Sequence, residues 1–157
     1  MRRENAFTLV ELSIAILIMV MLFMLALPSL SGVLADHRLR RLLDGLNGLV
    51  RTAQERSVNE RQPYLIIWKE DRLDLQQEAL VKGKRVPAIS TLRLRKGESF
   101  KLGLPAALAE KRPAEWIFWT TGTCEPAVVT YRSADGGWVA NYSPLTGRPE
   151  LKTYATR

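Results

Sequence analysis

The 157-residue chain has one cysteine and one histidine, and this scarcity excludes several kinds of site. Cys124 has no second cysteine for an intramolecular disulfide, so we expect a small buried apolar residue there. His37 lies among charged residues after an apolar segment and is expected to be a solvated helix residue. No His/Cys cluster has metal-ligand spacing, and no glycine-rich phosphate loop is present. The sequence therefore predicts neither an enzyme nor a cofactor-binding protein.

Charge is missing from one long stretch. Residues 12–35 contain no charged side chain, whereas the residues that follow are rich in Arg, Asp and Glu. As a helix, residues 7–27 would cover about 30 Å, which is enough to cross a bilayer core. Arg2 and Arg3 precede the apolar run and should stay in the cytoplasm, so the residues after the run should lie on the other side of the membrane. The pattern predicts one membrane-spanning helix.

A secretory signal peptide is the alternative for this segment, because it also has a basic start and an apolar centre. Here, however, an apolar stripe continues past the run at spacings of three and four residues, from Leu39 to Ala53. A cleaved signal peptide would not need that stripe. We expect the helix to continue and to end between Ser57 and Pro63, with Pro28 kinking or loosening it.

Glu11 is the one carboxylate near the start of the apolar run. A charged side chain costs about 2.5–3.5 kcal/mol on insertion scales at mid-membrane, so Glu11 suggests a partner. Cleavage between Ala6 and Phe7 would leave an α-ammonium group four residues away, on the same helix face as Glu11. That amine could pair with Glu11 of its own chain or of a neighbour. Alternatively, Glu11 snorkels to the membrane interface.

The residues Ala6-Phe7-Thr8-Leu9-Val10-Glu11-Leu12, followed by the long apolar run, resemble the cleavage and methylation motif of type IV prepilins and type II secretion pseudopilins. The resemblance implies cleavage between Ala6 and Phe7 by a prepilin peptidase and N-methylation of Phe7. It also implies that Glu11 is the assembly carboxylate. The family usually has Gly before the cut, where this chain has Ala6.

From residue 64 onward the pattern changes to short runs typical of β-strands. Asp135-Gly136-Gly137 is a turn signal between two of them, and residues 103–115 are expected to form a loop with a short helical turn. The fold class is α+β: a long N-terminal helix followed by a small antiparallel, sandwich-like sheet domain. The expected segments are a leader (1–6), a transmembrane helix (7–30), its amphipathic continuation (31–62) and a periplasmic β domain (63–157). The expected strands are 64–68, 72–76, 91–95, 99–102, 116–119, 127–131 and 138–142.

A second resemblance lies further along the chain. Arg51-Thr52-Ala53-Gln54, Thr121-Gly122-Thr123-Cys124 and Pro144-Leu145-Thr146-Gly147-Arg148 resemble H-type minor pseudopilins of type II secretion and the related FimT-type minor pilins. The resemblance implies a β-sandwich and a structural subunit of a periplasmic pseudopilus. Its partners would be other pilin or pseudopilin subunits, the prepilin peptidase and an inner-membrane assembly platform. The protein would cross the bacterial inner membrane once, with its C-terminal domain in the periplasm.

Two alternatives remain. A net charge of +7 also fits nucleic acid, and some FimT-like minor pilins bind DNA through a basic C-terminal motif. Arg148, Lys152 and Arg157 are the candidate DNA contacts, although Glu150 opposes phosphate binding. The other alternative is a single-pass anchored periplasmic binding domain, in which Glu11 would have no role in assembly.

Overall fold

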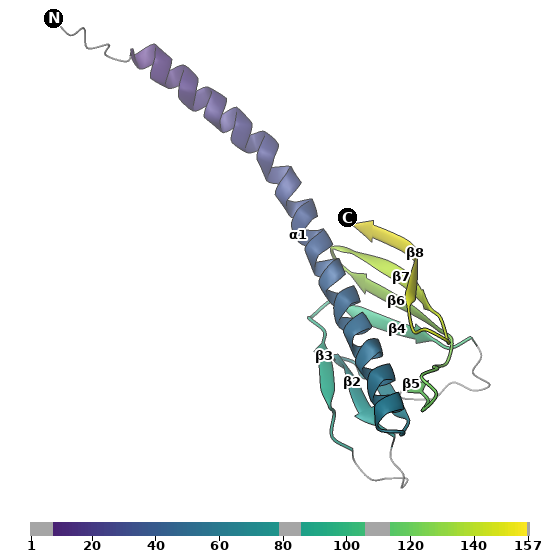
Figure 1. Cartoon of the computed structure of the whole chain (residues 1–157). Helices are drawn as coiled ribbons and strands as arrows, with labels where there is room; N and C mark the ends of the chain where they lie inside the picture. Colours follow the sequence, from purple (N-terminus) through teal and green to yellow (C-terminus); the bar gives the residue numbers. More distant parts are fainter. Residues whose placement is uncertain (1–7, 79–85, 106–113, 157) are drawn as a thin grey trace, which may run out of the picture.

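The computed structural model describes residues 8–78, 86–105 and 114–156, with the side chains of residues 25–31 left out. One long helix precedes eight strands (Figure 1). The elements are α1 (Leu9–Asn59), β1 (Tyr64–Trp68), β2 (Arg72–Gln77), β3 (Ser90–Arg93), β4 (Ser99–Gly103), β5 (Glu115–Phe118), β6 (Ala127–Ser133), β7 (Gly136–Tyr142) and β8 (Pro149–Thr156).

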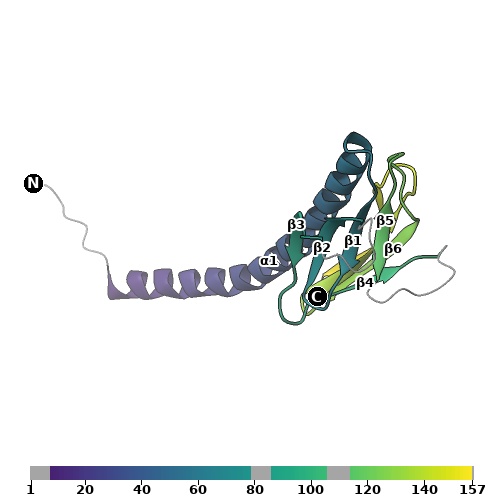
Figure 2. The same ribbon diagram turned by 90° about the horizontal axis from the view of Figure 1, so that it is seen from below.

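The two halves of α1 have different surroundings. The N-terminal half projects away from the rest of the chain, and the C-terminal half lies against the sheets (Figure 1). Figure 2 shows that the axis of α1 changes direction between the two halves. At its far end, Glu60 caps the helix with a 2.8 Å hydrogen bond from its backbone N–H to the carbonyl of Arg56. Among the described residues, no helix has the length and hydropathy needed to cross a membrane.

The predicted apolar stripe on the second half of α1 is confirmed. Its side chains are buried against the sheets and lie at the spacing of one helix face. At about 1.5–3 kcal/mol for each buried aliphatic side chain, this stripe fixes α1 on the domain. Its members are Leu39, Leu42, Leu43, Leu46, Leu49, Val50 and Ala53.

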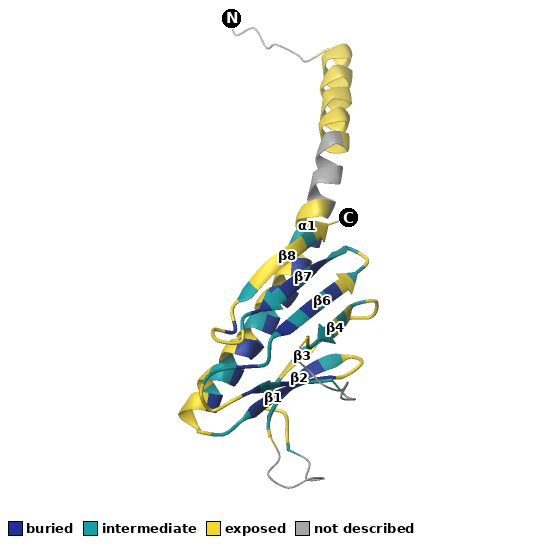
Figure 3. Cartoon of the chain, turned by 90° about the vertical axis from the view of Figure 1, so that its right-hand side faces the viewer, coloured by how far each residue is buried: buried dark blue, intermediate teal, exposed yellow. Residues whose placement is uncertain are grey.

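The strands form two four-stranded antiparallel sheets. We call them sheet one, in the order β3-β2-β1-β5, and sheet two, in the order β4-β6-β7-β8. Their inner faces share one core with α1, and Trp116 of sheet one meets Tyr142 of sheet two edge-on, with ring centroids 5.0 Å apart. Figure 3 shows the buried residues concentrated where α1 and the sheets meet. The predicted antiparallel, sandwich-like domain is confirmed.

Several strand predictions need correction, among them the strand expected at 91–95, which is β3 at Ser90–Arg93. β8 was not predicted at all, and β5 ends at Phe118 because Trp119 enters a turn in which the N–H of Gly122 bonds the carbonyl of Trp119 at 2.9 Å. The turn expected at residues 135–137 lies one residue earlier, since Gly136 and Gly137 already pair in β7. Gly103 belongs to β4, and most of the short helical turn expected at 103–115 lies outside the described residues.

Candidate assembly site on the projecting helix

The projecting half of α1 is an apolar surface that no other described part of the chain covers. Every large apolar side chain between Leu9 and Met24 is at least 46% exposed, and Leu9 reaches 82% (Figure 3). Soluble monomers rarely leave so large a contiguous apolar area in water, so a surface of this kind marks a contact with a membrane or with other proteins. The residues that the sequence analysis placed in the membrane are thus available for such a contact.

Glu11 lies in the first turn of this helix, and its side chain is exposed. Thr8 is the N-cap residue, with extended backbone (φ −78°, ψ 150°), and its hydroxyl accepts a 3.3 Å hydrogen bond from the N–H of Glu11. A carboxylate in the first turn is also favoured by the helix dipole. Ala6 and Phe7 lie outside the described residues, so the expected pairing of Glu11 with the Phe7 amine stays a prediction.

Sequence reasoning missed the capping role of this segment. Thr8-Leu9-Val10-Glu11 has the spacing of a capping box, in which Ser or Thr caps the helix and Glu or Gln follows three residues later. The signal was present in the motif that suggested cleavage and assembly. The capping bond uses the Thr8 hydroxyl and the backbone N–H of Glu11, so the Glu11 side chain is not part of it.

Polar contacts tie α1 to sheet two where the projecting half begins. The Tyr154 hydroxyl donates to Asp36 Oδ1 at 2.5 Å, and Arg40 Nε donates to Asp36 Oδ2 at 2.8 Å. The hydrogen bonds from Tyr154 and Arg40 lower the pKa of Asp36. Burial and the neighbouring Asp36 carboxylate raise the pKa of Tyr154 to about 12. Two residues after Asp36, Arg38 bonds Asp135 of the β6–β7 turn at 3.0 Å.

The basic residues near the C-terminus are not gathered in one place by the described structure. Arg148 is exposed in the turn before β8. Lys152 lies on β8 and donates from Nζ to Glu150 Oε1 at 2.6 Å. Arg157 lies outside the described residues. A carboxylate therefore already engages one of the two described candidates for DNA contact.

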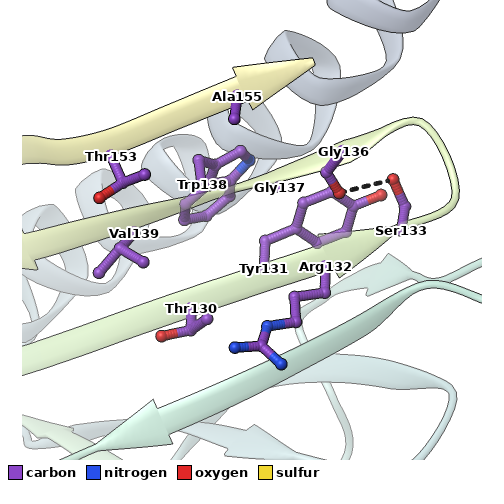
Figure 4. A pocket seen from close by; sticks show the side chains of 10 residues that line it. All are labelled: Thr130, Tyr131, Arg132, Ser133, Gly136, Gly137, Trp138, Val139, Thr153 and Ala155. Atoms are coloured by element: carbon purple, nitrogen blue, oxygen red, sulfur yellow. Dashed lines mark hydrogen bonds between the residues drawn. The ribbon is translucent and has the colours of Figure 1, made fainter. Parts of the chain in front are cut away.

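Sheet two carries a hollow of about 630 Å³ beside the β6–β7 turn (Figure 4). Thr130, Arg132, Ser133, Val139 and Thr153 are among its lining residues, and Ser133 Oγ donates to the carbonyl of Gly136 at 3.2 Å. No carboxylate, imidazole or thiol is among the residues that line it. The hollow thus has hydroxyl groups and a guanidinium but no general base.

Cys124 is buried and His37 is exposed. Cys124 is 1% exposed, as expected for a buried apolar residue, and burial raises the pKa of its thiol to about 11. His37 is exposed on α1, which agrees with a solvated helix residue. Within the described parts of the chain, no group of three His, Cys, Asp or Glu residues could hold a metal ion.

Comparison with known proteins gives matches in structure and none in sequence. No protein-family model matches the chain, and no curated protein sequence matches it. Among solved structures, the type IV minor pilin FimU of Pseudomonas aeruginosa strain PAO1 superposes with a TM-score of 0.53 and 18% identity, covering 75% of this chain and 90% of FimU. The chain has the fold of a type IV minor pilin.

A second crystal form of FimU gives a TM-score of 0.52 at 19% identity, with 73% of this pilin-like chain and 93% of FimU covered. The minor pseudopilin EpsH from the type II secretion system of Vibrio cholerae gives a TM-score of 0.47 at 15% identity, with 81% and 96% covered. FimU is described as a type IV minor pilin, and EpsH is described as a minor pseudopilin.

Proposed function

We propose that this chain is a minor subunit of a pilus-type fibre, with a structural role. Before assembly the projecting half of α1 lies in the bacterial inner membrane, and the sheet domain lies in the periplasm. The observation that carries this proposal is the contrast along one helix: the apolar side chains between Leu9 and Met24 are exposed, and those from Leu39 to Ala53 are buried. Covering each exposed aliphatic side chain gains about 1.5–3 kcal/mol, first in lipid and then against neighbouring helices.

The residues at the start of the chain have distinct roles in this proposal. The prepilin peptidase cleaves between Ala6 and Phe7, and Phe7 is then N-methylated. The Glu11 carboxylate forms an ion pair with the α-ammonium group of Phe7 in a neighbouring subunit. This pairing sets the register of otherwise interchangeable apolar helices. The exposed side chain of Glu11 at the start of an apolar helix supports this role.

Within this class we propose the pseudopilus of a type II secretion system, assembled on its inner-membrane platform. The second candidate is a FimT-like minor type IV pilin that serves pilus assembly or DNA uptake. The resemblance to FimU concerns the fold and is compatible with both fibres. The pairing of Lys152 with Glu150 weighs against a phosphate-binding row at the C-terminus, because one of its cations is already neutralised.

Two substitutions separate the assembly role of Glu11 from the capping of α1 by Thr8. Glu11→Gln removes the charge, but Gln still fits a capping box, so the helix should start normally while the subunit fails to enter the fibre. Thr8→Ala removes the capping hydroxyl, at about 0.5–2 kcal/mol, and keeps the charge, so this variant should still assemble. The measurement is the amount of each variant in sheared fibres relative to the membrane fraction.

The intact mass of the protein provides the companion measurement. A mature chain that begins at N-methylated Phe7 is expected only in cells that contain a prepilin peptidase. If residues 1–6 stay on the chain with and without the peptidase, and Glu11→Gln assembles as well as the native chain, an anchored periplasmic binding domain becomes the better description. Loss of protein secretion on deletion of the gene would favour the pseudopilus, and loss of DNA uptake would favour the pilus.

A further inference from the structure

A groove runs between the C-terminal half of α1 and the turn that leads into β8. Its volume is about 460 Å³. One wall is α1, and the other is the turn between β7 and β8. It lies apart from the hollow on sheet two, since the two share no lining residue. The lining residues are Asn47, Val50, Arg51 and Gln54 from α1 and Thr146, Gly147, Arg148 and Pro149 from the turn and the start of β8.

Gln54 of α1 contacts the opposite wall at Gly147, and it also bonds the chain outside the groove, at Gly122. Gln54 Nε2 donates to the carbonyl of Gly122 at 3.0 Å, and the Gln54 amide lies against Gly147 so closely that a Cβ there would come within 2.6 Å of it. Gly147 has φ +61° and donates its N–H to the carbonyl of Ser143 at 2.8 Å. The shape of the groove is thus fixed in the free subunit, which lowers the entropy lost on binding.

The groove offers hydrogen-bond donors. The side chains of Arg51 and Arg148 are exposed at its two walls. Asn47 Oδ1 already accepts a 2.8 Å bond from the Tyr142 hydroxyl, which leaves the amide NH₂ of Asn47 as its remaining polar group. Arg51 Nε donates to Glu55 at 2.7 Å, which uses one of the five donors of its guanidinium. No acidic residue lines the groove, so an acceptor with negative charge fits it.

A single carboxylate fits better than a nucleic-acid backbone. A phosphate chain needs consecutive cations along its path. Here Glu55 already bonds Arg51, and Glu150 already bonds Lys152, the next cation along the chain after Arg148. Arg residues bind one carboxylate through paired hydrogen bonds, and Arg51 and Arg148 line the two walls of one groove, so together they suit one acidic side chain.

The position of the groove indicates what occupies it. One wall is the same helix whose projecting half is exposed for contact with other chains, and Gly48 leaves open space on α1 between Asn47 and Arg51. A subunit that packs along α1 would pass over this opening. We infer that the groove receives an Asp or Glu side chain from the adjacent subunit of the fibre, held by Arg51 and Arg148. This inference rests on the proposed function.

The test uses Arg148→Lys in the full-length chain, within fibres or envelopes treated with a water-soluble carbodiimide. The reagent joins a lysine amine to a carboxylate in contact with it, and it does not join arginine. We expect peptide mapping to find position 148 linked to an Asp or Glu of another fibre subunit. The native chain, which has Arg148, should lack this link. Arg132→Lys, on sheet two, should give no link between subunits.

The chain contains its own reagent control, because Lys152 and Glu150 lie 2.6 Å apart and should be linked within the chain in every sample. The double variant Arg51→Ala/Arg148→Ala should lower incorporation into the fibre about tenfold, as expected for the loss of charge-assisted hydrogen bonds. If position 148 links only to Glu55 or Glu150 of its own chain, or to nothing while the control link forms, the inference is wrong.

The remaining outcomes separate this inference from the proposed function and from DNA binding. Retention of a short DNA duplex by the native chain, lost in the double variant, would assign the groove to phosphate and overturn the carboxylate assignment. Normal fibre incorporation of the double variant, with Glu11→Gln still excluded, would refute the groove and leave the proposed function in place. Failure of the native chain to enter any fibre would instead refute the proposed function.

Discussion

Replacement of Gly147 by alanine should destabilise the fold through the contact between the turn before β8 and α1. Two costs add at this position. With φ at +61°, a residue with a Cβ pays about 1–2 kcal/mol for the left-handed backbone. The added Cβ would also lie 2.6 Å from the Gln54 amide, so Gln54 must move and give up its bond to the carbonyl of Gly122, at about 1 kcal/mol. The expected loss is about 2–3 kcal/mol.

Gly48 provides the matched control, because the same substitution there should have the opposite sign. Gly48 lies inside α1 with open space around the position of a Cβ. Alanine in a helix interior is about 0.5–1 kcal/mol more favourable than glycine. Gly48→Ala should therefore stabilise the chain by that amount. In addition, Gln54→Ala should remove the steric part of the Gly147→Ala cost and leave only the backbone part.

Thermal unfolding of the full-length chain in detergent, followed by tryptophan fluorescence, measures both effects. All four tryptophans lie beyond α1, at positions 68, 116, 119 and 138, so the signal reports the sheet domain. For a chain of this size, 1 kcal/mol corresponds to about 2–4 °C in Tm. We expect Gly147→Ala to lower Tm by about 4–12 °C and Gly48→Ala to raise it by about 1–4 °C. Equal changes of the same sign in both variants would refute the reasoning.

Two further predictions concern buried ionisable groups. Burial disfavours the charged form of Asp74, but hydrogen bonds from Lys69, Thr91 and Arg72 outweigh burial and lower the pKa of Asp74. The ionised carboxylate therefore stabilises the fold above about pH 4, and this stabilisation is lost as the pH falls further. Asp74→Asn should flatten the acid side of a Tm profile and cost about 1–3 kcal/mol at pH 7; an unchanged profile would contradict this. Burial raises the pKa of the Cys124 thiol to about 11. A thiol reagent at pH 8 should therefore react about 10²-fold more slowly with the folded chain than with the chain in denaturant. Equal rates would contradict the burial of Cys124.

Much of the fold was predictable, because its periodic patterns are set by local geometry. The spacing of Leu39, Leu42, Leu46 and Ala53 at three, four and seven residues follows one face of a helix, and all four side chains are buried. β1 and β2 were also predicted as strands, and the structure pairs them as a hairpin with Trp68 opposite Leu73. In both cases, residues close together in the sequence are enough to predict the element.

β8 escaped prediction because it is an edge strand with little burial to produce alternation. Most of its residues are exposed, and it opens on Pro149, which is tolerated at the start of an edge strand. Its pairing with β7 includes an irregularity between Val139 and Ala140. Tyr154 is half-buried, and its partner Asp36 lies 118 residues away in the sequence. No local pattern could reveal that contact.

Of the two candidate sites, one could be found from the sequence and the other could not. Glu11 was found because a carboxylate beside an apolar run is anomalous in any structure. The groove was not found, because Arg51 and Arg148 line it only through the packing of a turn on α1, with Gln54 and Gly147 in contact. A short donor-lined groove is a property of the fold, whereas a charge in an apolar segment is a property of the sequence.

The continuity of α1 connects the two proposed contacts. Glu11 and Arg51 lie on one helix, about 60 Å apart along its length at 1.5 Å per residue. The polar contacts at the root of the projecting half, Arg38 with Asp135 among them, are partly exposed and contribute little. The buried aliphatic stripe therefore determines how the domain is fixed to the rod. In the proposed fibre, register set at Glu11 would fix the height of the groove beside each neighbour, so an acidic residue that fits the groove must lie at one level of the adjacent subunit.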